Sequence, residues 1–259
     1  MINFRDVNEP NSVLGPERWM GKLLRSPLRL IPRSAVLPIL QGPGRGLRWI
    51  VGSYNHGCWL GSYEYEKQLA LKRLVRPGDV VYDVGAHVGF FTIILSRLVG
   101  AAGQVYAFEP VPENYAYLLR HTVLNRITNV VAVKAAIGFA TGMRHFGRGP
   151  HSATGRLSGH EGFECEVYNL VEYMLAHNLR PPSLIKIDVE GAEAEVVPSI
   201  LDYVVARRIP LLVSTHSTEI TRSLADLLSV RGYVITSLQW ARQPGVRTLD
   251  TATLILATA

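Results

Sequence analysis

The chain alternates short apolar runs with longer stretches whose apolar residues recur at helical spacing. The apolar runs predict strands over residues 80–84, 104–109, 130–135, 183–189, 210–215, 232–238 and 252–258. The stretches between them predict helices over 89–99, 112–126, 169–178, 191–206 and 219–230. The central strands are continuous Val, Ile and Leu runs, as expected where helices cover both faces of a sheet. The pattern therefore predicts an α/β fold with a doubly wound, seven-stranded, mostly parallel sheet.

The two ends of the chain depart from this alternation. No helical pattern separates the last two predicted strands, only a polar loop, so we expect them to form an antiparallel, hairpin-like end to the sheet. Residues 1–60 are rich in Pro and Gly and predict an N-terminal extension of short helices and loops, with strands near Leu47–Val51 and Cys58–Leu60. A helix over 62–75 then opens the main domain, which we place at residues 61–259.

Residues 137–168 interrupt the alternation in the middle of the domain. The part from Gly147 to Gly155 is polar and rich in glycine, which predicts an irregular loop. A loop this long in a compact domain is either a functional lid over the site or a surface excursion, and both interpretations stay open. His151 lies in this loop and is a candidate for contact with the molecule on which the site acts, called the acceptor. A surface position explains it equally simply.

Composition narrows the class of protein. Apolar residues make up 47% of the 259 residues and charged residues 19%, which fits a globular domain rather than a disordered chain. Cys58 and Cys165 lie 107 positions apart, which argues against a zinc finger or a disulfide scaffold and favours a reducing, cytoplasmic location. The first residues carry charge and lack the apolar core of a secretory signal. No apolar run reaches the ~18 residues of a membrane-spanning helix.

The net charge of +6 is concentrated near the start of the chain. Its main contributors are Lys22, Arg25, Arg29, Arg33, Arg45 and Arg48. Such a segment can contact an anionic partner or a membrane surface, but a solvated basic face is the simpler interpretation.

The first motif with chemical content is D-V-G-A-H-V-G over residues 83–89, directly after an apolar run. Gly85 and Gly89, with Ala86 between them, let a ligand approach the backbone, and the following helix offers free N–H groups. Glu109 follows the next strand, 20 residues past Gly89, at the spacing from which a carboxylate reaches a ribose. The segment therefore predicts a nucleoside site.

Asp83 distinguishes this loop from the dinucleotide fingerprint, which has a glycine at that place. A carboxylate there would repel a pyrophosphate but suit the cationic amino acid end of S-adenosylmethionine. The spacing resembles the S-adenosylmethionine loop of class I methyltransferases. Asp83 argues against a nicotinamide dehydrogenase, and so does the predicted seventh strand, because the dehydrogenase sheet has six strands.

A second motif follows the fourth strand of the predicted sheet. Asp188 comes at the strand's carboxyl end, Glu190 two residues later, and Gly191 opens the next helix. Ligands of open parallel sheets bind outside these strand ends, so Asp188 and Glu190 should converge with Gly85 and Glu109. Three carboxylates in one place are costly unless a cation or hydrogen-bond donors meet them, and a sulfonium ligand would do so.

Together these motifs resemble the FkbM-type methyltransferases over about residues 58–218. The similar segments are W-L-G-S-Y-E at 59–64, P-G-D-V-V-Y-D-V-G-A-H-V-G at 77–89, F-E-P-V-P-E-N at 108–114 and K-I-D-V-E-G-A-E at 186–193. The resemblance implies S-adenosyl-L-methionine as cofactor and methylation of a hydroxyl oxygen on a sugar, glycan or natural product. The chain departs from the family pattern at Ser214, where an acidic residue is common, and at residues 169–171, where a T-L-D turn is favoured.

A hydroxyl is a poor nucleophile, so a base near the acceptor oxygen should help the transfer. His216 follows the fifth strand and is our first candidate; Asp188 is the second and also a candidate cofactor ligand, and Glu190 would face the acceptor. His216 could instead only hydrogen-bond within the site. A hard divalent cation held by these three residues is a further alternative, but no additional fixed ligand is visible, so we expect no metal.

Two other function classes remain as alternatives. An RNA or DNA methyltransferase would share the fold, but amino methylases of bases carry an Asn/Asp-Pro-Pro-aromatic run where this chain has Asp188–Gly191, and no basic stretch is interleaved with aromatic residues. We therefore expect no nucleic-acid partner. A non-catalytic binding protein on this fold is the other alternative. Nothing in the sequence indicates an oligomeric state.

Overall fold

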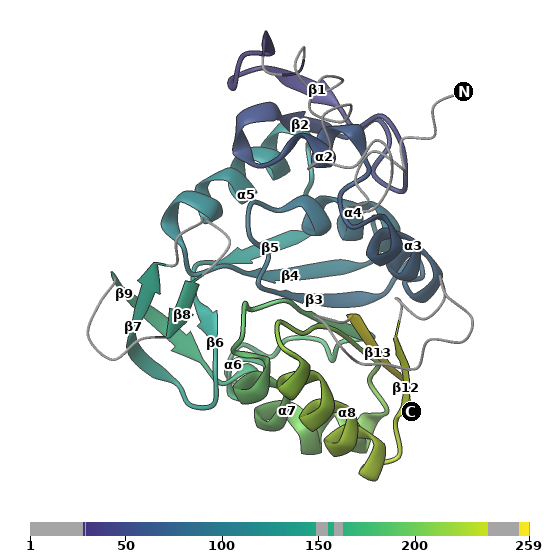
Figure 1. Ribbon diagram of the computed structural model, residues 1–259, viewed down its shortest axis with the longest axis vertical. Helices are drawn as coiled ribbons and strands as arrows, with labels where there is room; N and C mark the ends of the chain where they lie inside the picture. Colours follow the sequence, from purple (N-terminus) through teal and green to yellow (C-terminus); the bar gives the residue numbers. More distant parts are fainter. Residues whose placement is uncertain (1–27, 29, 149–154, 158–162, 238–253, 259) are drawn as a thin grey trace.

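The computed structural model describes residues 28, 30–148, 155–157, 163–237 and 254–258 (Figure 1). Its central sheet has seven strands in the order β12-β13-β11-β10-β3-β4-β5. The strands are β3 (Val80–Val84), β4 (Gln104–Phe108), β5 (Val130–Val133), β10 (Leu184–Ile187), β11 (Leu211–Ser214), β12 (Val234–Ser237) and β13 (Leu254–Thr258). β13 runs antiparallel to both of its neighbours, and the other paired strands are parallel. The predicted doubly wound α/β sheet with its antiparallel end is confirmed.

Helices cover both faces of this sheet, as Figure 1 shows. One face carries α3 (Tyr65–Leu74), α4 (Phe90–Val99) and α5 (Pro112–Leu124), and the other carries α6 (Leu170–Ala176), α7 (Glu193–Arg207) and α8 (Thr218–Val230). β3 and β10 are buried along their whole length, which explains why their sequences are apolar except for the paired residues Asp83 and Lys186. The side chain of Asn169 accepts hydrogen bonds from the N–H groups of Val171 and Glu172, so asparagine caps α6 where the family favours a T-L-D turn.

The described part of the N-terminal segment packs onto the main domain. It contains β1 (Val36–Pro38), the antiparallel strand β2 (Arg48–Ile50), the 3₁₀ helix η2 (Val51–Ser53) and α2 (His56–Leu60). Its buried residues, among them Trp49, share one hydrophobic cluster with α4. The strand predicted near Leu47–Val51 is confirmed as β2, but the strand predicted at Cys58–Leu60 is wrong. Those residues belong to α2, because three apolar residues do not distinguish the two periodicities.

The described parts of the interruption at 137–168 form a second small sheet, and residues 149–154 of the predicted glycine-rich loop fall outside the described residues. Its strands are β6 (Ala136–Ile137), β7 (Gly142–Arg148), β8 (Gly155–Leu157) and β9 (Phe163–Tyr168), in the order β6-β9-β7-β8. The backbone N–H of Phe139 and the guanidinium of Arg144 both bind Glu195 in the first turn of α7. The small sheet therefore lies against the end of α7 that faces the predicted site. His151 falls outside the described residues, and its acceptor contact stays a prediction.

Two further expectations concern the environment of the protein. Within the described ranges no helix is long and apolar enough to cross a membrane. Cys58 and Cys165 are both buried and unpaired, as expected for a chain without a disulfide framework. Lys22, Arg25 and Arg29 of the basic segment fall outside the described residues.

Candidate active site

The loop after β3 is pressed against the end of β10. Gly85 and Ala86 donate backbone hydrogen bonds to the carbonyl of Phe108 at the end of β4. Gly85 has φ +78°, and a Cβ at this position would overlap the Asp188 carbonyl oxygen. Only glycine fits both the conformation and the space. The predicted convergence of Gly85 and Asp188 is therefore present, with backbone against backbone.

Asp83 lies inside the sheet, with its side chain 0% exposed. One of its oxygens accepts from the ammonium of Lys186 at 2.7 Å, and the other accepts from the hydroxyl of Thr92 at 2.6 Å. Lys186 also donates to the Gly85 carbonyl at 3.2 Å. Asp83 thus fixes the shape of the loop through Lys186. The direct contact with a cofactor that the sequence predicted for Asp83 has no support from this geometry and stays a prediction.

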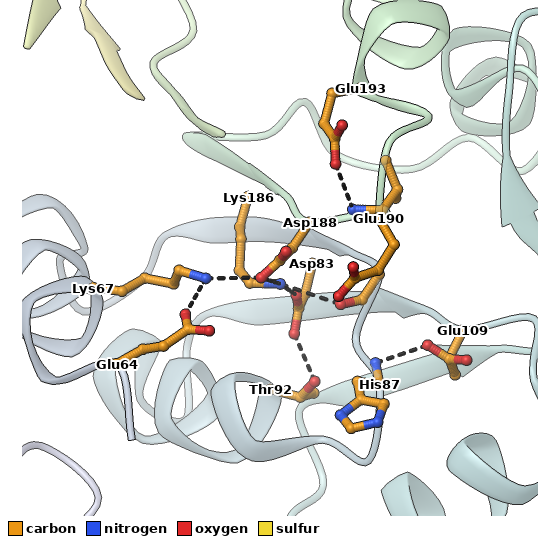
Figure 2. Close-up of polar contacts among 12 residues, drawn as sticks. Glu64, Lys67, Asp83, His87, Thr92, Glu109, Lys186, Asp188, Glu190 and Glu193 are labelled. Carbon is orange, nitrogen blue, oxygen red and sulfur yellow. Dashed lines mark hydrogen bonds and ion pairs between the residues drawn. The ribbon is translucent and has the colours of Figure 1, made fainter. Parts of the chain in front are cut away.

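Asp188 is held by a cation that sequence reasoning did not assign. The ammonium of Lys67, from α3, donates to Oδ2 of Asp188 at 2.7 Å, and Lys186 lies 4.0 Å from the same oxygen (Figure 2). Burial alone would raise the pKa of Asp188, but the charges of the two lysines outweigh it and lower the pKa to about 2. The protein supplies its own cations to Asp188, so a sulfonium ligand is not required to neutralise this carboxylate.

His216 occupies the predicted place, immediately beyond β11. Its Nδ1 lies 2.7 Å from a carboxylate oxygen of Glu193, which also accepts from the backbone N–H of Gly191. Because a carboxylate only accepts, Nδ1 carries the proton. The other ring nitrogen, Nε2, faces Asp188 Oδ1 at 3.7 Å and Glu190 Oε2 at 3.4 Å. These distances exceed those of short charge-assisted hydrogen bonds, so Nε2 is not tightly held.

The charges around His216 set its protonation. Burial alone would lower the pKa of the imidazole, but the hydrogen bond to Glu193 raises it. The negative charges of Glu193, Glu190 and Asp188 act in the same direction, and the net pKa of His216 is above its ordinary value. Sequence reasoning missed Glu193, although it closes the K-I-D-V-E-G-A-E segment.

Glu190 is brought into the same group by an unusual backbone. It has φ +52°, a conformation that non-glycine residues rarely adopt, and its side chain is 30% exposed. Asp188, Glu190 and His216 each offer one ligand atom within 4.8 Å of the others. Lys67 already occupies Asp188, which opposes a second cation there, and we assign no metal.

The segments that form this site also match a known protein family. A family model described as the FkbM methyltransferase domain matches residues 83–235, more than half of the chain. The chain belongs to the FkbM methyltransferase family. Of the segments that carry the resemblance, the loop over 83–89, the turn over 108–114 and the segment over 186–193 lie inside the matched region, and the segment over 59–64 lies before it.

Individual relatives of this FkbM domain are distant. The chain is 28% identical over 162 residues to the 31-O-demethyl-FK506 methyltransferase FkbM of Streptomyces tacrolimicus, covering 49% of this chain and 62% of that protein. It is 25% identical over 153 residues to the hexuronic acid methyltransferase AglP of Haloferax volcanii, covering 58% and 62%. It thus spans about three fifths of these relatives. A solved structure of methyltransferase FkbM from Methylobacillus flagellatus has a TM-score of 0.48 at 16% identity, covering 80% of this chain and 56% of that one.

S-adenosylmethionine is the cofactor of the FkbM family, and the nucleoside end of the site fits it. Glu109 lies at the end of β4, where its carboxylate accepts from the backbone N–H groups of His87 and Val111 and from the Asn114 amide. These three donors leave lone pairs for ribose hydroxyls. The buried Nε2 atom of His87 has no hydrogen-bond partner among the described residues, so a polar ligand group beside this loop would satisfy it.

The pKa of Glu109 makes cofactor binding depend on pH. Burial raises this pKa to about 7, although the three donors lower it in part. Ribose hydroxyls donate hydrogen bonds, so they bind the ionised carboxylate best. We expect S-adenosylhomocysteine to bind roughly tenfold more weakly at pH 6 than at pH 8, because only the ionised fraction is competent.

Calorimetric titration at the two pH values measures this difference. Glu109→Gln should bind weakly and with no pH dependence, whereas Glu113→Gln, an exposed residue on α5, should behave like the wild type. Equal wild-type affinities at pH 6 and pH 8 would show that the Glu109 carboxylate does not contact the ligand.

Proposed function

We propose that this protein transfers a methyl group from S-adenosylmethionine to a hydroxyl oxygen of a sugar, glycan or natural product. The observation that carries the proposal is His216, whose Nε2 faces the site while Nδ1 is fixed by Glu193. In the tautomer that carries its proton on Nδ1, Nε2 is unprotonated. A neutral Nε2 can take the proton from a hydroxyl. The names of two relatives support the acceptor class, since one specifies an oxygen position and the other a hexuronic acid.

The chain's own residues have separate tasks in this reaction. The bound cofactor supplies an electrophilic methyl group on a sulfonium. Glu109 holds the nucleoside, and the loop fixed by Asp83 and Lys186 shapes the binding surface beside it. His216 takes the hydroxyl proton at Nε2, and the carboxylates of Glu190 and Asp188 stabilise the resulting imidazolium. Much of the remaining catalysis comes from holding acceptor and donor in line.

Transfer of a tritiated methyl group tests the acceptor class. Incubation of the protein with labelled S-adenosylmethionine and fractionated cell extract should label a sugar-containing or small-molecule fraction and leave RNA and DNA unlabelled. His216→Ala, which keeps the nucleoside end intact, is the matched control and should lose most of the label. Labelled RNA would overturn the hydroxyl acceptor in favour of a nucleic-acid methyltransferase. Absence of both labelling and S-adenosylhomocysteine binding would overturn methyl transfer itself.

A further inference from the structure

Lys67 belongs to the site although it lies outside the region that the family model matches. It is on α3, before residue 83, and its side chain is only 6% exposed. The ammonium crosses from this helix to Oδ2 of Asp188 at 2.7 Å, a separation of 121 residues in sequence. The same ammonium pairs with Glu64 and lies 5.0 Å from the centre of the Phe91 ring. Figure 2 shows Lys67 entering the group from the side opposite Glu109.

We propose that Lys67 is a positioning residue that holds Asp188 away from His216 and so keeps Nε2 of His216 available for the acceptor proton. This inference rests on the proposed function of His216. The two oxygens of Asp188 have different surroundings: Oδ2 binds Lys67 at 2.7 Å, whereas Oδ1 stays 3.7 Å from Nε2. Fixing one oxygen fixes the orientation of the whole carboxylate.

Among the described residues, Lys67 is the cation that hydrogen-bonds Asp188 directly. Lys186 is the second lysine in the group, but its ammonium is committed to Asp83 at 2.7 Å and lies 4.0 Å from Asp188. Besides the phenols of Tyr54 and Tyr63, the described charged and titratable groups around Asp188 and His216 are Glu64 just before α3, Lys67 from α3, Asp83 and His87 from β3 and its loop, Lys186 from β10, Glu190 from the segment after it, and Glu193 from α7. Most of them are anionic, so Lys67 supplies much of the compensating charge.

Loss of Lys67 should draw Asp188 and His216 together. A carboxylate without a partner at Oδ2 gains most by turning toward the imidazole, where it stabilises the protonated ring. His216 would then stay protonated to a higher pH and could not accept the hydroxyl proton near neutrality. A lysine that served only packing would affect stability without this effect on His216.

An NMR titration of the His216 ring measures this effect without any acceptor. The ring signal is assigned by its loss in His216→Asn. In Lys67→Met we expect the pKa of His216 to rise by roughly one unit, the scale of losing one nearby positive charge that disfavours the imidazolium. The low-pH limb of kcat should move upward by the same amount. Lys67→Arg, which keeps the cation, should return both to wild type, and Lys72→Met, an exposed lysine on the same helix, should change neither.

An unchanged His216 titration in folded Lys67→Met, or an equal shift in Lys72→Met, would overturn the proposal. Lys67→Leu, which likewise removes both the donor and the charge, gives the same measurement if the methionine variant does not fold. Failure of the proposed function is a separate result: the titration of His216 would shift as expected, while no hydroxyl acceptor would be methylated.

Discussion

Lys186→Met is expected to lower the free energy of unfolding by about 3–5 kcal/mol, the cost of breaking one partner of a buried ion pair. Lys186 and Asp83 are 2% and 0% exposed, and their charged atoms lie 2.7 Å apart between two central strands. Methionine keeps the length of the side chain but leaves Asp83 charged and buried, with only Thr92 as donor. Since whole domains are stable by about 5–15 kcal/mol, this one change removes a large share.

Urea unfolding followed by circular dichroism measures the loss. Asp83→Asn combined with Lys186→Met should recover part of it, because the double variant buries no unpaired charge. Lys134→Met removes an exposed lysine and should stay within about 0.5 kcal/mol of wild type. If Lys186→Met lowered the free energy of unfolding by less than about 1 kcal/mol, the result would contradict an ion pair that is shielded from water.

The central sheet could be predicted from sequence because its strands are buried on both faces. Strands such as β3 and β10 are apolar at all but one position, and a charged residue within or just after such a run is then conspicuous. Asp83, Glu109 and Asp188 were found for this reason. The parallel topology that places these strand ends at one edge follows from the alternation of strands and helices.

The small sheet could not be recognised by the same rule. β9 is only partly buried, so its apolar residues alternate with polar ones over a short span, and the described side chains of β7 are mostly exposed. Phe163, Cys165 and Val167 carry that alternation, and it was a usable signal for β9. The glycine-rich composition around Gly147 outweighed it in favour of a loop.

The cations of the site were missed for a different reason. A lysine within a predicted helix is normally expected to face solvent, and Lys67 lies within such a helix. Its partner, Asp188, is 121 positions away, and only the packing of α3 brings them together. Lys186 had a clearer signal, because a lysine inside a continuous apolar strand must find a buried counter-charge.

His216→Ala is expected to lower kcat by roughly 10²–10⁴, the contribution of a positioned general base. Its affinity for S-adenosylhomocysteine should stay close to wild type, because we expect the nucleoside to contact Glu109 at the end of β4. His177→Ala is the matched control: this histidine is exposed at the end of α6 and its loss should leave kcat unchanged. Single-turnover rates at saturating acceptor measure the difference.

The pH profile of kcat adds a second test of the same residue. A base acts in its neutral form, so the rate should fall as the pH drops through the pKa of His216. That pKa lies above the ordinary value of about 6.5 because Glu193 binds the ring, together with the charges of Glu190 and Asp188. Glu193→Gln removes the larger of these influences, so it should move the low-pH limb of the profile downward and reduce the rate, since Nδ1 is no longer fixed.

The two measurements together separate a base from a bystander. If His216→Ala kept more than about half of the wild-type kcat, alignment of the substrates alone would account for the catalysis. His216→Ala could lower kcat as expected while Glu193→Gln leaves the low-pH limb of the kcat profile unchanged. That result would mean that His216 aids the reaction without taking the proton. Loss of activity in EDTA, with recovery on adding a divalent ion, would replace the base by a metal-assisted mechanism.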